Sequence, residues 1–430
     1  MATINVMDFD AVPDATLLST QAIQRAIDSA SAGDTVLIPA GCFLTGSLFL
    51  KSDMRLELAE NAVLLGSPHQ QDYPSIATRV AGINMCWPAA ILNVNHCRNV
   101  TIAGNGTIDG QGAIWWHKFW GADENSGMLA GYSQRGLRWV VDYDCERPRN
   151  VVVYESESVT LDGFTSRESG FWNIHVCYSQ QVNLRGLRVL NSAGPSTDGI
   201  DIDSSENILV ESCTVSCNDD NICVKSGRGA EARQQARTAR GIIIRDCTLL
   251  KGSGITLGSE TSGGIEDVII EHNHFSGTGV GFRIKSARNR GGWIKNIDVR
   301  HLTLEDVCYP FMLQLNWFPQ YSYGDRSLDA ESPAHWHKLA EGVEGEEGLT
   351  RVENISVSHI SSRLNPAMAF SRAFFIEGAA ERPIQGLRFS DVTLQATEFG
   401  KIAGVNALVF DRVTIDAPAV TLSENDAYHR

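Results

Sequence analysis

The six residues SVTLDG, Ser158–Gly163, place one polar residue before alternating apolar and polar side chains and end at a glycine. Such alternation predicts a short strand with one buried face. The pattern returns as NVTIAG at Asn99, QVNLRG at Gln181, NILVES at Asn207, GIIIRD at Gly241, DVIIEH at Asp267, NIDVRH at Asn296, NISVSH at Asn354, GLRFSD at Gly386 and ALVFDR at Ala407. The commonest interval is roughly 20 to 35 residues, the range of solenoid repeats.

Most intervals are too short for a crossover helix and hold short strands separated by turn residues. We therefore predict an all-β fold, a right-handed single-stranded parallel β-helix whose successive coils stack around one core. A β-propeller fits less well, because its blades need four antiparallel strands joined by tight hairpins.

Two intervals are nearly doubled, and we interpret the extra residues, about 111–148 and about 316–348, as loop insertions in one domain of residues 1–430. The open end of a solenoid needs a cap. The segment STQAIQRAIDSA, residues 19–30, predicts a capping helix with alanines and isoleucines on one face.

Composition excludes several classes of protein. The net charge of −15 argues against nucleic acid and anionic membrane surfaces as partners. No apolar run is long enough to span a membrane, and the first residues lack a secretory signal pattern. We expect a cytoplasmic protein, or a periplasmic or secreted one if a signal has been removed. The ten cysteines form no CxxC pair, so we expect reduced thiols and neither metal nor cofactor.

Five aspartates lie close together in STDGIDIDSS and CNDDNICVKSG: Asp198, Asp201, Asp203, Asp219 and Asp220. Clustered carboxylates repel one another unless cations, water or chemistry compensates. In a strand the isoleucines of DGIDID point to the core, so the alternating aspartates point outward. The next coil repeats this arrangement about 4.8 Å away, which predicts one surface site.

Cations follow on the same predicted face. In GVGFRIKSARNRGG, Arg283 and Lys285 alternate with apolar residues, and Lys225 follows the second aspartate pair. Acids that transfer protons next to cations that bind carboxylate indicate an acidic sugar polymer as substrate. Tyr309 is expected to flank the same groove. His175, in FWNIHV, either packs in its coil or contacts substrate.

Each of these residues also has a structural interpretation. Aspartates in β-helix turns commonly accept backbone hydrogen bonds, and the cations are equally suited to a solvated strand face. The ordered group of residues, and no single member, favours a functional site.

The segments STDGID, NDDNICVKSG, GSGITLGSE and FRIK resemble, in order, the four signature segments of glycoside hydrolase family 28, the polygalacturonases. GTIDGQGAIWW, FWNIHV and LGSETSGG extend the resemblance over most of the chain and look more like the exo-acting bacterial and plant branches. The resemblance implies inverting hydrolysis of α-1,4-galacturonosyl bonds. By position, Asp219 is then the general acid, while Asp198 and Asp220 activate water.

The resemblance also implies that Arg283 and Lys285 bind the sugar carboxylate and that Tyr309 lines the catalytic subsite. Lys225, Ser253, His175 and Asp201 complete the candidate substrate-binding residues.

Two positions depart from the family pattern. Ser196 replaces the usual asparagine. Ser253 stands in place of the histidine of Gly-His-Gly, or Gly252 does if the spacing shifts by one residue. Members that act on rhamnogalacturonan also lack this histidine, although they generally depart at the paired acids as well. A rhamnogalacturonan-type glycosidase is therefore the first alternative.

Two other classes remain open. A β-helix pectate lyase would hold Ca²⁺ through the aspartates, and a non-catalytic solenoid would only bind pectin. The insertions are rich in aromatic residues, which either pack the loops onto the coils or stack on sugars and wall off the groove. A wall would favour exo action on an acidic pectic oligosaccharide. The sequence does not indicate an oligomeric state.

Overall fold

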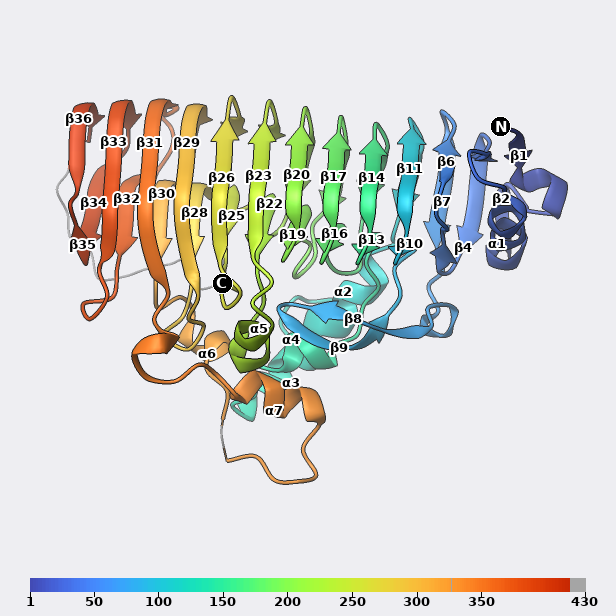
Figure 1. The fold of residues 1–430 in the computed structure, drawn as a ribbon, viewed down its shortest axis with the longest axis horizontal. Helices are drawn as coiled ribbons and strands as arrows, with labels where there is room; N and C mark the ends of the chain where they lie inside the picture. The colour runs from blue at the N-terminus through green and yellow to red at the C-terminus, as the bar shows by residue number, and fades with distance from the viewer. Residues whose placement is uncertain (326, 418–430) are drawn as a thin grey trace. The chain divides into compact units, whose positions relative to one another are not determined.

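The computed structural model describes residues 1–325 and 327–417. These residues form two compact units. The first comprises Met1–Val80, Asn84–Gly136 and Val141–Asp219, and the second Ala81–Ile83, Leu137–Val140 and the described residues from Asp220 onward. Within each unit, strands pair in parallel with strands of the next coil, as in a parallel β-helix (Figure 1). The predicted fold class is confirmed, while the single domain stays a prediction.

The strands up to Cys217 are short, and most are three to seven residues long. They are β1 (Thr3–Asn5), β2 (Asp14–Leu18), β3 (Thr35–Ile38), β4 (Gly41–Thr45), β5 (Leu48–Phe49), β6 (Met54–Leu58), β7 (Ala62–Gly66), β8 (Ser75–Val80), β9 (Ile83–Pro88), β10 (Leu92–Asn95), β11 (Arg98–Gly104), β12 (Thr107–Asp109), β13 (Val151–Tyr154), β14 (Glu157–Asp162), β15 (Thr165–Arg167), β16 (Ile174–Cys177), β17 (Gln180–Arg185), β18 (Arg188–Ser192), β19 (Ile200–Asp203), β20 (Glu206–Glu211) and β21 (Thr214–Cys217).

The strands after Asp220 include the longest ones of the described chain. They are β22 (Ile222–Lys225), β23 (Ala239–Arg245), β24 (Thr248–Leu249), β25 (Ile255–Leu257), β26 (Ile265–Glu271), β27 (His274–Ser276), β28 (Val280–Lys285), β29 (Trp293–Glu305), β30 (Tyr309–Gln314), β31 (Arg351–Arg363), β32 (Arg372–Glu377), β33 (Ile384–Gln395), β34 (Glu398–Ala403), β35 (Val405–Asn406) and β36 (Val409–Asp416).

The repeated hexapeptides occupy equivalent places in successive coils. In the first unit, Val159 of SVTLDG aligns with Val100 and Val182 of the neighbouring coils, and all three side chains are buried. In the second unit, Ile297 aligns in the same way with Val268 and Ile355. The apolar residues of the pattern therefore form the core of each unit, as the period-2 alternation predicts.

The two ends of each hexapeptide are sharp corners of the coil. Ser158 and Gly163 have φ of +56° and +82°, and Asn296 and His301 have φ of +57° and +54°. This left-handed conformation is costly for most residues and easiest for glycine, asparagine and aspartate. The corner thus favours the polar residue or glycine that opens and closes these repeats, although ALVFDR opens with Ala407, at a φ of +55°.

Short helices lie between the strands. They are α1 (Thr20–Ser29), α2 (Ala113–Trp120), α3 (Gly127–Gln134), α4 (Val141–Asp144), α5 (Gly229–Gln235), α6 (Pro319–Ser322), α7 (Ala334–Ala340) and the 3₁₀ helices η1 (Val6–Phe9), η2 (Gln70–Asp72) and η3 (Gly345–Gly348). In residues 1–325 and 327–417, no helix is long and apolar enough to cross a membrane.

Helix α1 is the predicted N-terminal helix, and its apolar face is buried at Ile23, Ala26 and Ile27. The segments predicted as loop insertions, 111–148 and 316–348, contain α2 to α4 and α6, α7 and η3 respectively. In the first insertion Trp115 and Phe119 are buried, so these aromatic side chains pack against protein. All ten cysteines are free thiols, as expected.

Candidate active site

The predicted site residues fall into both units. His175, Asp198, Asp201 and Asp219 belong to the first unit, and Asp220, Lys225, Ser253, Arg283, Lys285 and Tyr309 to the second. The unit boundary lies between the consecutive residues Asp219 and Asp220.

Strand β28 places two cations on its outer face. Ile284 is fully buried in the core of the second unit, so Arg283 and Lys285 on either side of it point away from that core. Arg283 aligns with Thr256 of β25. Both cations are only 4% exposed, which means that their charges are largely removed from water. The alternation in FRIK correctly predicted their common face.

Asp220 is the centre of this charge group. Its Oδ2 lies 2.6 Å from Nζ of Lys285, and its Oδ1 accepts a hydrogen bond of 2.7 Å from the hydroxyl of Thr256. A guanidinium nitrogen of Arg283 lies 3.9 Å from Oδ1. Burial alone would raise the pKa of Asp220, but Lys285, Arg283 and Lys225 hold it below its ordinary value. Asp220 is therefore a carboxylate, able to accept a proton or orient a water molecule.

Lys225 pairs with a residue that sequence analysis missed. Its Nζ lies 3.3 Å from Oε2 of Glu260, and both side chains are buried. The hydroxyl of Ser259 donates to the other oxygen of Glu260 at 3.0 Å. Burial would raise the pKa of Glu260, whereas Lys225 and Arg290 are among the cations that lower it. Glu260 lies in the quoted segment LGSETSGG, but no periodicity identifies a partner 35 residues away.

Trp317 is a second residue that the sequence did not single out. The centroid of its ring lies 4.5 Å from Nζ of Lys285 and 5.6 Å from the guanidinium carbon of Arg283. An aromatic face attracts cations and covers them without forming a hydrogen bond. Trp317 therefore packs against both cations on this face.

Close packing around the turn Gly252-Ser253-Gly254 explains its two glycines. A Cβ at Gly254 would meet the carbonyl oxygen of Val280 at 2.1 Å, and one at Gly252 would meet the amide of Asn221. Asn221 accepts a hydrogen bond of 2.7 Å from the N–H of Gly254 and so fixes the turn. Ser253, between these glycines, is 9% exposed.

Tyr309 lies at the start of β30, aligned with Val280 of β28. It packs in a cluster with Val280, Met312 and Phe375 and is 3% exposed. Met312 aligns with Arg283, so Tyr309 packs against the neighbour of that cation.

In the first unit, His175 is the centre of a buried polar network. It aligns with Asp201 of β19, and both side chains are fully buried. Its Nδ1 lies 2.6 Å from a guanidinium nitrogen of Arg149, and its Nε2 lies 3.6 Å from a carboxylate oxygen of Asp203. Because a guanidinium only donates, Nδ1 is the acceptor and the proton is on Nε2. Burial lowers the pKa of His175 to about 4.

Arg79 and Arg149 complete this network, and neither was predicted. Arg79 donates to Asp203 at 3.2 Å and to the hydroxyl of Ser204 at 2.7 Å. Burial lowers the pKa of Arg149 to about 10. The ligand atoms of His175, Cys177 and Asp203 lie close enough to share a metal ion. Two guanidinium groups already face that cluster, however, and they would repel a cation.

Asp198 and Asp219 occupy different surroundings. Asp198 is 3% exposed, and its backbone carbonyl accepts hydrogen bonds from the backbone and side chain of Asn173. Asp219 is half-buried, in the turn after β21. Ser196 has φ of +53°, a conformation that asparagine adopts readily. This explains why asparagine suits that position in the family pattern.

Comparisons with known proteins agree with the sequence motifs. The profile of glycosyl hydrolases family 28 matches residues 34–327. A probable polygalacturonase of Vitis vinifera is 29% identical over 405 residues, which cover 91% of this chain and 74% of that protein. An exo-poly-α-D-galacturonosidase of Dickeya chrysanthemi is 29% identical over 335 residues, or 71% of this chain. That match spans 55% of the Dickeya protein.

Solved structures show the same fold. A family 28 exopolygalacturonase of Yersinia enterocolitica gives a TM-score of 0.72 at 25% identity, covering 97% of this chain and 79% of that one. A hyperthermoactive exopolygalacturonase of Thermotoga maritima gives a TM-score of 0.79 at 24% identity, covering 96% and 91%.

Proposed function

Because the chain belongs to glycoside hydrolase family 28, a family of inverting hydrolases, we propose that it cleaves α-1,4-galacturonosyl linkages in pectic oligosaccharides. The observation that carries this proposal is the buried group of Asp220, Arg283 and Lys285. It combines an ionised carboxylate with two cations on one face, which is what hydrolysis of an acidic sugar requires.

We assign the roles of general acid and general base to three aspartates, Asp198, Asp219 and Asp220. Asp219 donates a proton to the glycosidic oxygen, and its partial exposure allows it to be reprotonated by solvent. Asp220 activates water together with Asp198, and the low pKa of Asp220 keeps it ionised for that task. An inverting mechanism needs acid and base on opposite sides of the bond, with space for water between the base and the sugar.

The substrate carboxylate binds Arg283 and Lys285. A buried carboxylate is best held by charge-assisted hydrogen bonds, and a guanidinium beside an ammonium offers several. Trp317 packs against both of these cations, and each cation is only 4% exposed. Lys225, Ser253, Tyr309, His175 and Asp201 remain proposed substrate-binding residues. The partner is thus an acidic pectic oligosaccharide.

Exo action is the proposed mode of attack. Relatives described as exo-acting support it, and so does the insertion 316–348, which brings Trp317 to the cations. Hydrolysis from a chain end releases the same small product throughout the reaction, whereas endo cleavage first yields a mixture of lengths. A cytoplasmic location stays a prediction.

Product analysis tests the proposal. Homogalacturonan oligomers and rhamnogalacturonan oligomers are incubated in parallel with the protein, and products are separated by chromatography. The proposal predicts one short product from the galacturonan throughout the time course. Products only from the rhamnogalacturonan would favour the alternative suggested by Ser253, and a ladder of lengths would contradict exo action.

A further inference from the structure

Glu260 is a buried carboxylate that the proposed mechanism does not use. It lies between β25 and β26 and is only 2% exposed. Its Oε2 lies 3.3 Å from Nζ of Lys225, and its Oε1 accepts a hydrogen bond of 3.0 Å from the hydroxyl of Ser259. A charged carboxylate is stable in such a place only when a cation and hydrogen bonds compensate its charge. Lys225 is thus an essential partner of Glu260.

The backbone around this pair keeps the two residues together. The carbonyl oxygen of Glu260 accepts a hydrogen bond of 2.7 Å from the N–H of Ser226, the residue after Lys225. Gly82 packs closely against the same place, because a Cβ at Gly82 would meet Cγ of Glu260 and Cβ of Arg228 at 2.6 Å each. The side chain of Glu260 therefore has little space in which to move away from Lys225.

Lys225 acts on two buried carboxylates, Glu260 and Asp220. Burial raises the pKa of Glu260, and among the cations Lys225 lowers it most. Burial also raises the pKa of Asp220, and Lys225 lowers it together with Lys285 and Arg283. Charges in a protein interior attract one another strongly, since little water screens them. Glu260 and Asp220 therefore compete for the charge of one lysine.

Cations outnumber these two carboxylates. Five buried cations lower the pKa of Glu260, of Asp220 or of both, and each is at most 4% exposed: Lys225, Arg228, Arg283, Lys285 and Arg290. Such an excess of positive charge suits the binding of an acidic sugar, but it weakens a carboxylate as a base. Glu260 offsets part of this excess.

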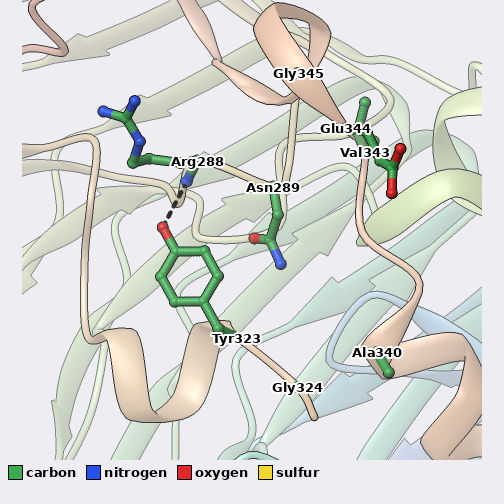
Figure 2. A pocket seen from close by; sticks show the side chains of 8 residues that line it. All are labelled: Arg288, Asn289, Tyr323, Gly324, Ala340, Val343, Glu344 and Gly345. Carbon is green, nitrogen blue, oxygen red and sulfur yellow. Dashed lines mark hydrogen bonds between the residues drawn. The ribbon is translucent and has the colours of Figure 1, made fainter. Parts of the chain in front are cut away.

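Two of the five cations are fixed by other contacts. Arg228 and Arg290 each donate to the carbonyl oxygen of Ser322 at 3.3 Å. Asn289, which lines a cavity of about 380 Å³, donates to the same oxygen at 3.1 Å (Figure 2). The hydroxyl of Ser322 in turn donates to the carbonyl of Trp317 at 2.7 Å. These bonds hold both guanidinium groups in place, so Lys225 is the cation whose position depends most on its carboxylate partner.

We propose that Glu260 is a positioning residue for the proposed hydrolysis: it holds Lys225 and keeps that ammonium group from occupying the carboxylate of Asp220. The inference rests on the proposed function, in which Asp220 accepts a proton or orients water. A carboxylate whose oxygens are taken by a further ammonium group is a poorer base. Loss of Glu260 therefore slows catalysis, while Arg283 and Lys285 still bind the substrate carboxylate.

Glu260→Gln tests the proposal, because glutamine keeps the size of the side chain and removes its charge. Steady-state kinetics with trigalacturonate are expected to show kcat reduced by at least about tenfold and KM raised by no more than about threefold. Glu271→Gln is the matched control: Glu271 also pairs with a cation, Arg300, but it lies on β26, in a different sheet from β22 and β28. Unchanged kcat in Glu260→Gln, a loss confined to KM, or an equal loss in Glu271→Gln overturns the proposal.

A second substitution separates charge from packing. Lys225→Met, added to Glu260→Gln, removes the ammonium group that would otherwise occupy Asp220. The double variant is therefore expected to have a kcat at least about threefold above that of Glu260→Gln, although its KM rises with the loss of Lys225. A purely structural role predicts the opposite, since a second change in the core adds to the damage. A kcat equal to or below that of Glu260→Gln contradicts the proposal.

Urea unfolding tests the pair without any need for activity, and it covers the case in which Glu260→Gln does not fold. Lys225→Met alone leaves Glu260 charged and buried, whereas the double variant contains neither charge. The double variant is expected to unfold at a higher urea concentration than Lys225→Met. If it unfolds at the same or a lower concentration, Glu260 does not depend on Lys225 and the proposal falls.

The positioning role and the proposed function fail in different ways. If the wild-type protein cleaves trigalacturonate and Glu260→Gln keeps its kcat, the function stands and the role of Glu260 falls. If the wild-type protein cleaves neither galacturonan nor rhamnogalacturonan oligomers, the proposed hydrolysis falls and the role of Glu260 in it falls as well, whatever the unfolding experiment shows of the pair.

Discussion

Nζ of Lys285 lies 2.6 Å from Oδ2 of Asp220, and both side chains are buried. Removing one partner of such a pair leaves an uncompensated buried charge, which lowers the stability of the folded protein by several kcal/mol. The pair therefore fixes the charge of Asp220 and also the position of Lys285. Because the pair joins Asp220, the proposed base, to Lys285, the proposed carboxylate-binding residue, a mutation of either residue is expected to impair the function of both.

Replacement of Lys285 by methionine is expected to reduce kcat/KM for trigalacturonate by at least about a hundredfold, since a buried charged hydrogen bond to substrate is lost. It also raises the pKa of Asp220, because burial is then opposed by fewer cations. The acidic limb of the pH profile of kcat/KM should move to higher pH. An unshifted limb would show that the titration of Asp220 does not set it.

Asp219→Asn removes the proposed acid while keeping the shape of the side chain. We expect kcat to fall by about 10² to 10⁴, the usual contribution of a general acid, with little change in the Kd of trigalacturonate. Rates and calorimetric affinities are measured on the same preparation. Near-normal kcat with weakened binding would identify Asp219 as a binding residue instead.

Trp317→Ala uncovers the two cations. The expected result is a KM for trigalacturonate raised by about three- to thirtyfold, the range of a partly desolvated cation–π contact, with a smaller change in kcat. Trp317→Phe is the control, because it keeps an aromatic face and should lose less. If the phenylalanine and alanine variants behave alike, the ring does not act through the cations.

The stability of the first unit should depend on pH through His175. Its folded pKa of about 4 is below the ordinary value near 6.5, so between these limits the unfolded chain binds a proton that the folded chain does not. Stability is therefore full above about pH 6.5 and falls as pH decreases, by about 2 kcal/mol between pH 6.5 and 5.

His175→Asn isolates this dependence, because asparagine offers an oxygen to Arg149 but does not titrate. Urea unfolding of both proteins at several pH values gives the comparison. The variant should lose less stability between pH 6.5 and 5 than the wild type. Parallel curves would mean that folding does not shift the pKa of His175.

Much of the fold was readable because each coil repeats the same local requirements. Hexapeptides such as SVTLDG set both the buried residues and the left-handed corners. The same alternation correctly placed Arg283 and Lys285 on one face, since strand geometry alone decides that question. Glu260 and Trp317 were missed for a different reason. Each reaches its cation from a turn or an insertion, where no period relates sequence to position.

The short helices of the insertions were also beyond a sequence prediction. Helices such as α2 and α7 have eight residues or fewer and need packing to form, so their sequences carry little signal of their own. His175 shows a third limit. The alignment of His175 with Asp201 follows from the coil spacing. Arg79 contacts Asp203 and Arg149 contacts His175, but both arginines lie far from these partners in the sequence.

Time-resolved proton NMR of trigalacturonate hydrolysis tests the central claim most directly. The anomeric signal of the newly formed reducing end is recorded before mutarotation mixes the two forms. Inverting hydrolysis of an α-linkage by Asp198, Asp219 and Asp220 predicts that the β-anomer appears first. First appearance of the α-anomer, or of alkene protons from an elimination, would contradict this mechanism.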